Sequence, residues 1–320
     1  MSSTTSEARK LVRRSKLFVP VNREKFIAKA WTRDADSIIL DLEDAIAPAD
    51  KASARKMVKD VIPVVNRGGA EIEVRINREF ELEDLGAIVF PGLTAVMIPK
   101  CESVGEIQRL DTMVTQLEKE RGLPEGEIQF DLLIETALGV VNAENIAQAS
   151  PRIVQINIGQ GDLSIDMGFP RFLELNFEQY FYAENKLLYA ARAAKVQACG
   201  LGAQNNVDFT SVSMGEEAMF KACHHASLMG YQGAAIIHPG WCHAVNEGFK
   251  PSKADLDMAR KVKAALDEAY AQRKGSVTVD GRMYDVANLK HVNYILERAE
   301  AIDRREAEKA AAVAAGGGIS

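Results

Sequence analysis

The chain has 320 residues, 47% of them hydrophobic and 26% charged, so it is long and apolar enough to bury a large core. Its formal net charge is −6, and the absence of a basic stripe from the sequence argues against a nucleic-acid partner. The sequence contains neither a signal peptide nor an apolar run of the ~20 residues that a membrane helix needs. The four cysteines are too scattered for paired cysteine chemistry. We therefore expect a cytoplasmic protein without membrane attachment.

Short apolar runs alternate with helical patterns along most of the chain. Eight strand–helix units in about 250 residues predict an α/β fold, the (β/α)8 barrel. An open doubly wound sheet is the alternative, but polar groups at the ends of nearly all strands favour the closed barrel, whose site lies at the carboxyl ends of its strands. The predicted strands are residues 17–19, 37–42, 71–77, 95–98, 130–134, 153–158, a weak strand within 200–208, and 233–237.

The composition divides the chain into four regions. Residues 1–14 are polar and predict a flexible N-terminus, and residues 15–250 hold the barrel. A C-terminal helical or lid segment follows at residues 251–310, and the Ala/Gly-rich residues 311–320 predict a flexible tail. The aromatic-rich residues 169–186 interrupt the repeat, and we expect them to form a lid or a subunit contact.

Two acids follow neighbouring predicted strands, the fifth and the sixth. Glu135 ends the first of these runs, and Asp162 follows the second after Gly159-Gln160-Gly161. Adjacent parallel strands lie roughly 5 Å apart, so the two carboxylates could share one ion, and hard oxygen ligands favour Mg²⁺ or Mn²⁺. Gly159 and Gly161 let backbone N–H groups approach a ligand. Helix capping and a dinucleotide fingerprint are the alternatives, and the fingerprint lacks its third glycine.

Three acids crowd the end of the second predicted strand: Asp41, Glu43 and Asp44. Asp41 lies within the apolar run, and because a buried charge needs a partner, we favour a functional role over a solvated turn. Arg75 ends the third strand, where it could hold a carboxylate through two parallel hydrogen bonds or form a surface salt bridge. Lys100, after the fourth strand, either contacts an anionic ligand or is solvated.

Other chemistry-bearing residues give weaker signals. Cys223-His224-His225 and Cys242-His243 lack the paired, spaced ligands of structural zinc sites, so we expect no zinc. Asp285 directly precedes the last predicted helix, and from the residues alone it is an N-cap.

Ordered motifs between about residues 15 and 300 have the spacing of one enzyme superfamily. They are LFVP at 17–20, SIILDLEDAIAP at 37–48 with the following KASAR, VRIN at 74–77, MIPKCES at 97–103, IETALGVVNAENIA at 134–147, GQGDL at 159–163, IHP at 237–239, VNEGFKPS at 245–252 and VDGRMYD at 279–285. With these motifs the chain resembles the citrate lyase β-subunit-like branch of the HpcH/HpaI aldolase superfamily, which includes malyl-CoA and citramalyl-CoA lyases.

The resemblance implies roles for the candidate residues. The acids at Glu135 and Asp162 would bind Mg²⁺, and Arg75 would hold the substrate. The acids within residues 41–44 would support the waters of the metal. Asp285 would come from a neighbouring subunit and act in proton transfer, in place of the capping role that the residues alone suggest.

The resemblance also implies the partners. CoA would lie along the barrel mouth near residues 17–22 and 237–239, and relatives of this type are homotrimers or hexamers. The candidate substrate and CoA contacts, besides the arginine already named, are Phe18, Asn22, Gly161, His238 and Pro239.

The function implied is a Mg²⁺-dependent lyase that cleaves or forms a 3-hydroxyacyl-CoA such as malyl-CoA or citramalyl-CoA. Its products or substrates would be acetyl-CoA and a small 2-oxo acid. Three alternatives stay open: a CoA-independent class II aldolase of 2-oxo-4-hydroxy acids, a malyl-CoA thioesterase, and a non-catalytic lyase subunit.

Overall fold

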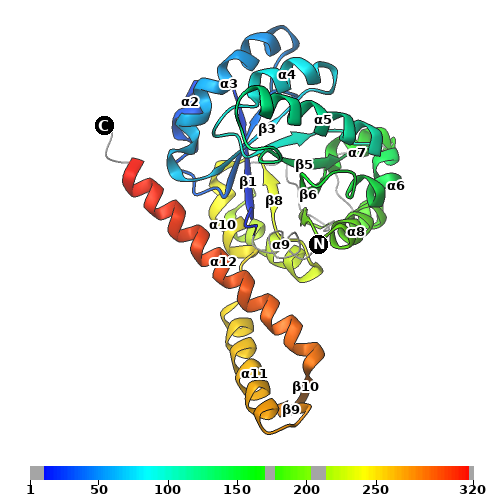
Figure 1. Cartoon of the computed structure of the whole chain (residues 1–320), viewed down its shortest axis with the longest axis vertical. Coiled ribbons are helices and arrows are strands. Elements are labelled where there is room, and N and C mark those ends of the chain that lie inside the picture. Colours follow the sequence, from blue (N-terminus) through cyan, green and yellow to red (C-terminus); the bar gives the residue numbers. More distant parts are fainter. Residues whose placement is uncertain (1–10, 170–176, 203–213, 317–320) are drawn as a thin grey trace. The chain divides into compact units, whose positions relative to one another are not determined.

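The computed structural model describes residues 11–169, 177–202 and 214–316, which alternate between helices and strands over most of their length (Figure 1). Within these ranges, no helix has both the length and the apolar character that crossing a membrane requires.

The chain forms two compact units. The larger unit comprises Arg13–Phe249 together with the segment from Glu308 onward. The smaller unit comprises Lys250–Ala307 together with the residues up to Val12. Each unit is described below by itself.

The larger unit contains an eight-stranded parallel sheet that nearly closes into a barrel, which confirms the predicted (β/α)8 architecture. The strand order is β7-β6-β5-β4-β3-β2-β1-β8. A parallel bridge joins Cys199 to Gly233, and the N–H of Gly200 donates to the carbonyl of Gly233 at 2.9 Å, which brings the two ends of the sheet together. The strands are β1 (Ser15–Pro20), β2 (Ser37–Asp41), β3 (Glu71–Arg75), β4 (Ala95–Ile98), β5 (Gln129–Ile134), β6 (Ile153–Ile158), β7 (Gln197–Cys199) and β8 (Ala234–Ile236).

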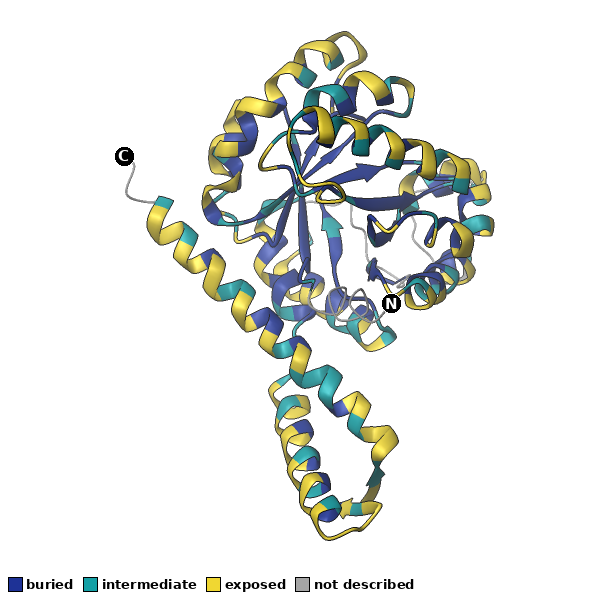
Figure 2. Ribbon diagram, in the orientation of Figure 1, coloured by how far each residue is buried: buried dark blue, intermediate teal, exposed yellow. Residues whose placement is uncertain are grey.

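Helices alternate with these strands along the chain and surround the sheet (Figure 1). They turn exposed faces outward, whereas the strands are buried (Figure 2). The α-helices are α2 (Glu24–Ala30), α3 (Lys51–Val65), α4 (Glu81–Ile88), α5 (Val104–Glu120), α6 (Ala137–Ile146), α7 (Gln160–Asp166), α8 (Phe177–Ala194), α9 (Glu216–Met229) and α10 (Cys242–Gly248). Four short 3-10 helices are η1 (Pro48–Asp50), η2 (Asn66–Gly68), η3 (Arg78–Phe80) and η4 (Pro239–Trp241).

The strands read as continuous apolar runs because both of their faces are buried. Ile38 and Leu40 of β2 belong to the large apolar cluster that includes the helices. Ile39, between them, belongs to a second cluster with Met97 and Leu133. Alternate residues of the strand therefore face opposite sides of the sheet, one toward the helices and one toward the barrel interior.

The start of the barrel corrects one prediction. We expected residues 1–14 to be flexible, but Arg13 and Arg14 are both fully buried. Arg13 donates to the side chain of Gln155 at 2.8 Å, and Arg14 pairs with Asp36 at 2.8 Å. These partners belong to other strands of the barrel or precede them, so tertiary contacts order this segment. Its polar composition gives no indication of such contacts. Residues 1–10 lie outside the described ranges.

The seventh strand also differs from the prediction. We expected it within residues 200–208, whereas β7 ends at Cys199 and residues 203–208 lie outside the described ranges. The strand escaped detection because Gln197 is polar yet completely buried, where its amide donates to the carbonyl of Arg13 at 2.8 Å.

The aromatic-rich stretch predicted at residues 169–186 falls partly outside the described ranges, which omit residues 170–176. Its second half is helical and forms the start of α8. Its role as a lid or a subunit contact stays a prediction.

The smaller unit is a helix, a hairpin and part of a long helix. They are α11 (Lys253–Ala271), the antiparallel pair β9 (Ser276–Val279) and β10 (Arg282–Asp285), and α12 (Val286–Gly316). Its apolar cluster contains Val262, Leu266 and Val292. The hairpin turns at Asp280 and Gly281, both at positive φ.

The end of α12 reaches beyond residue 311, where we predicted a flexible tail to begin, and it continues to Gly316. Lys309, which itself belongs to the larger unit, is almost fully buried and pairs with Asp34 and Asp36 at 2.8 and 2.7 Å. Gly69 makes room for this helix, because a Cβ at that position would lie 2.9 Å from the Cβ of Ala312. These contacts, together with the helix propensity of alanine, order the segment.

Candidate active site at the carboxyl ends of the strands

Neighbouring parallel strands bring the predicted charged residues to one end of the barrel. Asp41 and Arg75 end β2 and β3, which pair in register at these two residues. Glu135 follows β5, and Asp162 lies in the first turn of α7, just after β6. Lys100 follows β4, between them. The sheet thus gathers residues that lie up to 121 positions apart in the sequence.

Arg75 is held in a fixed orientation by the acids of the β2 end. Its Nε and Nη2 donate to the two oxygens of Asp41 at 2.7 and 2.6 Å, the bidentate geometry that the sequence suggested. Its Nη1 lies 2.9 Å from Glu43 and 3.2 Å from Asp44. The ring of Phe18 lies 4.9 Å from its guanidinium carbon, within range of a cation–π contact.

Asp41 also shapes its own turn. Its carboxylate accepts the N–H groups of Glu43 and Ala45 at 2.9 and 3.1 Å. The side chain of Asp41 is 2% exposed, so its carboxylate interacts with these two N–H groups and with Arg75 rather than with solvent. Asp41 therefore positions the arginine and the acids that follow it.

Glu135 is a buried acid in an acidic environment. Burial first, and then the charges of Asp162 and Glu43, raise the pKa of Glu135 to about 8. Gly159 makes its position possible, because a Cβ at Gly159 would lie 2.4 Å from Oε2 of Glu135. Gly159 is thus required because it packs against Glu135. The sequence had indicated only that a glycine lets backbone N–H groups approach a ligand.

Lys100 contacts three of these acids. Its ammonium lies 2.8 Å from Glu43 and 3.0 Å from Asp162, and its backbone N–H donates to Glu135 at 3.0 Å. The sequence left this lysine between ligand contact and solvation, and the structure places it among the acids.

The donor set fits a hard divalent cation. Glu135 and Asp162 offer carboxylate oxygens, and burial, followed by repulsion from Asp162 and Glu43, raises the pKa of Glu135, so a bound cation would favour its ionised form. Across the described ranges, no group of three or more His, Cys, Asp and Glu side chains has the arrangement of a metal site. An ion on these two acids would thus complete its shell with substrate and water.

Two cavities meet at the site. One, of about 460 Å³, is lined by Glu135, Gly161 and Asp162, with Asn157 among its other lining residues. The other, of about 630 Å³, lies beside β1 and α2. Four residues line both cavities, so the two adjoin: Phe18, Asp44, Arg75 and Ile237.

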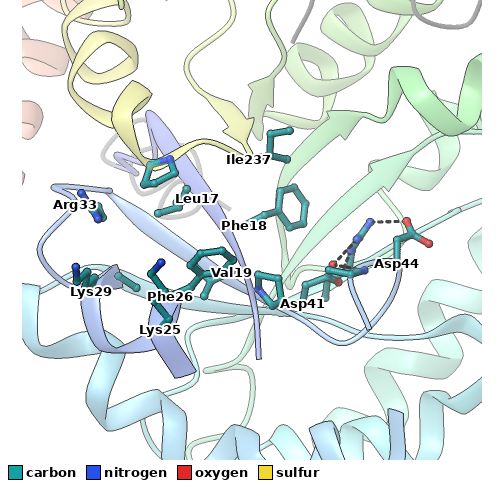
Figure 3. A pocket seen from close by; sticks show the side chains of 15 residues that line it. Leu17, Phe18, Val19, Lys25, Phe26, Lys29, Arg33, Asp41, Asp44 and Ile237 are labelled. Atoms are coloured by element: carbon teal, nitrogen blue, oxygen red, sulfur yellow. Dashed lines mark hydrogen bonds and ion pairs between the residues drawn. The ribbon is translucent and has the colours of Figure 1, made fainter. Parts of the chain in front are cut away.

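The second cavity combines an apolar wall with a basic side. Phe18 and Phe26 contribute to its apolar part. Figure 3 shows Lys25, Lys29 and Arg33 gathered on the side of the cavity away from Asp44. Sequence reasoning missed these three cations, although Lys25 and Lys29 are four residues apart and therefore lie on one face of α2, and Arg33 follows soon after the end of that helix.

Only some of the remaining predicted substrate and CoA contacts line the two cavities. Pro239 lines the larger cavity, whereas Asn22 and His238 are absent from the described linings of both. The ring of His238 lies 5.2 Å from that of Trp241. Asp285 belongs to the smaller unit, where its Oδ1 accepts the N–H of Ala287 at 2.8 Å as an N-cap does.

Fold and site together define a (β/α)8-barrel enzyme with an acid-rich centre at the carboxyl ends of its strands. The family model for HpcH/HpaI aldolase/citrate lyase matches residues 14–239. The chain therefore belongs to this family, and it is an enzyme of the carbon–carbon lyase class.

Curated relatives cover most of the chain. The citrate lyase subunit beta of Leuconostoc mesenteroides subsp. cremoris is 35% identical over 86% of this chain and 89% of the relative. The L-malyl-CoA/beta-methylmalyl-CoA lyase of Cereibacter sphaeroides is 30% identical over 90% of this chain and 95% of the relative.

Solved structures agree with the fold. The Mycobacterium tuberculosis protein CitE, in complex with magnesium, acetoacetate and coenzyme A, is similar with a TM-score of 0.67 at 27% identity, over 91% of this chain and 99% of that protein. A citrate lyase from Burkholderia xenovorans LB400 has a TM-score of 0.78 at 18% identity, over 93% of this chain and 96% of that protein, and supports the fold alone.

Proposed function

We propose that this chain is a Mg²⁺-dependent lyase that cleaves or forms a 3-hydroxyacyl-CoA such as malyl-CoA or citramalyl-CoA. The partners in the reaction would be acetyl-CoA and a small 2-oxo acid. The observation that carries the proposal is the pair of adjoining cavities: an acid-rich one suited to a cation and an oxo acid, and an apolar one with a basic side suited to CoA. The names of the curated relatives and the ligands of the similar CitE structure support the same assignment.

Glu135 and Asp162 would hold the cation. Bound there, Mg²⁺ or Mn²⁺ would act as a Lewis acid on the ketone of the oxo acid. The buried carboxylate of Glu135 has a pKa raised to about 8, and a cation that keeps this group ionised at neutral pH would relieve its repulsion with Asp162.

Arg75 would bind the negative oxygens of the oxo acid. Its guanidinium is already oriented by two hydrogen bonds to Asp41, so little freedom is lost when substrate binds. The arginine lines both cavities, which supports a role for its charge between the oxo acid and the acyl end of the thioester.

The basic side of the second cavity would bind the phosphates of CoA. Lys25, Lys29 and Arg33 line the same cavity as Phe18 and Phe26, so this cavity would match both the polyanionic and the apolar parts of a CoA thioester. Lysine and arginine both bind phosphate, lysine as a point charge.

Asp285 would transfer the proton. In the direction of bond formation its carboxylate would take a proton from the methyl group of acetyl-CoA, and in cleavage it would return one to the same carbon. Among the described residues, hydrogen bonds reach Asp285 at Oδ1, so Oδ2 is left to act as the base. We propose that the residue is delivered by a neighbouring copy in a homotrimer or hexamer.

The test compares metal dependence with thioester binding. Glu135→Gln and Asp162→Asn should each abolish Mg²⁺-stimulated cleavage of malyl-CoA and citramalyl-CoA. Lys29→Met should raise KM for the thioester without lowering kcat, since its charge would bind substrate and transition state alike. Lys221→Met, at an exposed helical lysine paired with Glu217, is the matched control. Full cleavage in the presence of a chelator would reject the metal role.

A further inference from the structure

Lys100 is placed where the proposed metal site needs charge compensation. Its ammonium bridges Glu43 at 2.8 Å and Asp162 at 3.0 Å, and its N–H donates to Glu135 at 3.0 Å. Lys100, which follows β4, thus contacts acids that follow β2, β5 and β6. A solvated lysine would not be expected to contact all three acids.

The backbone at Lys100 is held in an uncommon conformation. Its φ of +49° lies in the left-handed region, which residues other than glycine seldom adopt. This conformation aims the N–H at Glu135 while the side chain reaches Glu43 and Asp162. The surrounding contacts maintain the strain, which points to a role for the residue at this position.

A divalent cation and Lys100 would compete for the same carboxylate. Asp162 is a proposed metal ligand, yet the ammonium already lies 3.0 Å from it. Two cations on one carboxylate repel each other. Glu43 offers the lysine a second partner, because its Oε1 pairs with Lys100 and its Oε2 pairs with Arg75.

We propose that Lys100 is an internal counter-ion of the metal site. It neutralises Asp162 while no metal is bound, and it gives up this carboxylate to the incoming cation while it stays on Glu43. The lysine thereby stabilises the metal-free protein and lowers the affinity for the metal. This inference rests on the proposed function, since it takes Glu135 and Asp162 as the ligands.

The experiment measures metal binding and stability with the cation alone. Mn²⁺ is titrated calorimetrically into the wild-type protein, Lys100→Met, Lys100→Arg and the control Lys119→Met, whose lysine is exposed and pairs with Glu125 at 3.3 Å. Thermal unfolding of the same four proteins is followed in a chelator. Lys100→Gln replaces the methionine variant should that variant not fold.

Loss of the charge should have two opposite effects. Lys100→Met should bind Mn²⁺ about tenfold more tightly, the lower end of what residues around a metal site contribute to affinity, and its Tm in chelator should fall. Lys100→Arg, which keeps the charge, and Lys119→Met should both resemble the wild type. A purely structural lysine would lower the Tm without tightening metal binding.

The outcomes separate this inference from the proposed function. Weaker or unchanged Mn²⁺ binding by Lys100→Met, with normal binding by the wild type, overturns the counter-ion role alone. An unchanged Tm of this variant in chelator overturns it as well. A wild-type protein that binds neither Mn²⁺ nor Mg²⁺ overturns both proposals.

Discussion

Replacement of Gly159 by alanine should damage the site through one steric contact. The added Cβ would lie 2.4 Å from Oε2 and 2.7 Å from Cβ of Glu135, both well inside van der Waals contact. The carboxylate could rotate away, but the Cβ of Glu135 is fixed to the end of β5, so the backbone after β6 must also shift. The backbone of Gly159, with φ of −97°, is open to alanine, so the contact with Glu135 is the obstacle.

Overpacking of this kind costs about 1–3 kcal/mol of folding free energy. Displacement of a ligating carboxylate should weaken Mg²⁺ binding by about tenfold or more. Urea unfolding measures the first effect, and calorimetric titration with Mg²⁺ measures the second.

Gly161→Ala provides the control from the same loop. A Cβ at Gly161 would meet nothing within 4 Å, and the residue lies in α7, where alanine is the better helix former by up to about 1 kcal/mol. This variant should be as stable as the wild type or slightly more stable. If Gly159→Ala binds Mg²⁺ as tightly as Gly161→Ala does, the steric argument for Glu135 is wrong.

Three further predictions concern the arginine, the proton-transfer residue and a buried acid. Arg75→Lys should lower kcat/KM by about 100-fold or more in steady-state assays, because a lysine cannot reproduce the bidentate contact with Asp41; retained activity would show that charge alone suffices. Asp285→Ala should abolish turnover yet leave calorimetric Mg²⁺ binding intact, and lost metal binding would refute the assignment. Burial disfavours the charge of Asp36, but Arg14 and then the α12 lysine that pairs with it lower its pKa to about 2. A depressed pKa stabilises the fold above the unfolded value of about 4, so about 2 kcal/mol should be lost between pH 4 and pH 2 in urea unfolding, and Asp36→Asn should remove this part of the pH dependence.

The positions of the acids and of Arg75 could be predicted because each lies at the end of a near-continuous apolar run or within a few residues after it. Parallel strands have their carboxyl ends at one side of the sheet, so residues that end different strands are expected to lie close together. A bidentate contact between Arg75 and some carboxylate was expected from this reasoning, and the structure identifies Asp41 as the partner. What the sequence could not supply is the partner of each charge, since Asp41 contacts both its own turn and the next strand.

Other features depend on tertiary contacts that leave no local signal. The buried Arg13 finds Gln155 142 positions along the chain, and a polar stretch ending in two arginines reads as a loose terminus. The conformation of Lys100 is equally hidden, because a positive φ outside glycine follows from contacts rather than from residue type. Lys25 and Lys29 resemble any solvated helix face until the apolar wall beside them is seen.

Product analysis tests the central claim most directly. The purified protein is incubated with Mg²⁺ and either malyl-CoA or citramalyl-CoA, and acetyl-CoA, free CoA and the 2-oxo acid are quantified together. We predict equal amounts of acetyl-CoA and glyoxylate or pyruvate. Release of free CoA without an oxo acid would indicate a thioesterase, and turnover confined to free hydroxy-oxo acids would indicate an aldolase that ignores CoA. Either result, or no turnover until another subunit is added, would contradict the account.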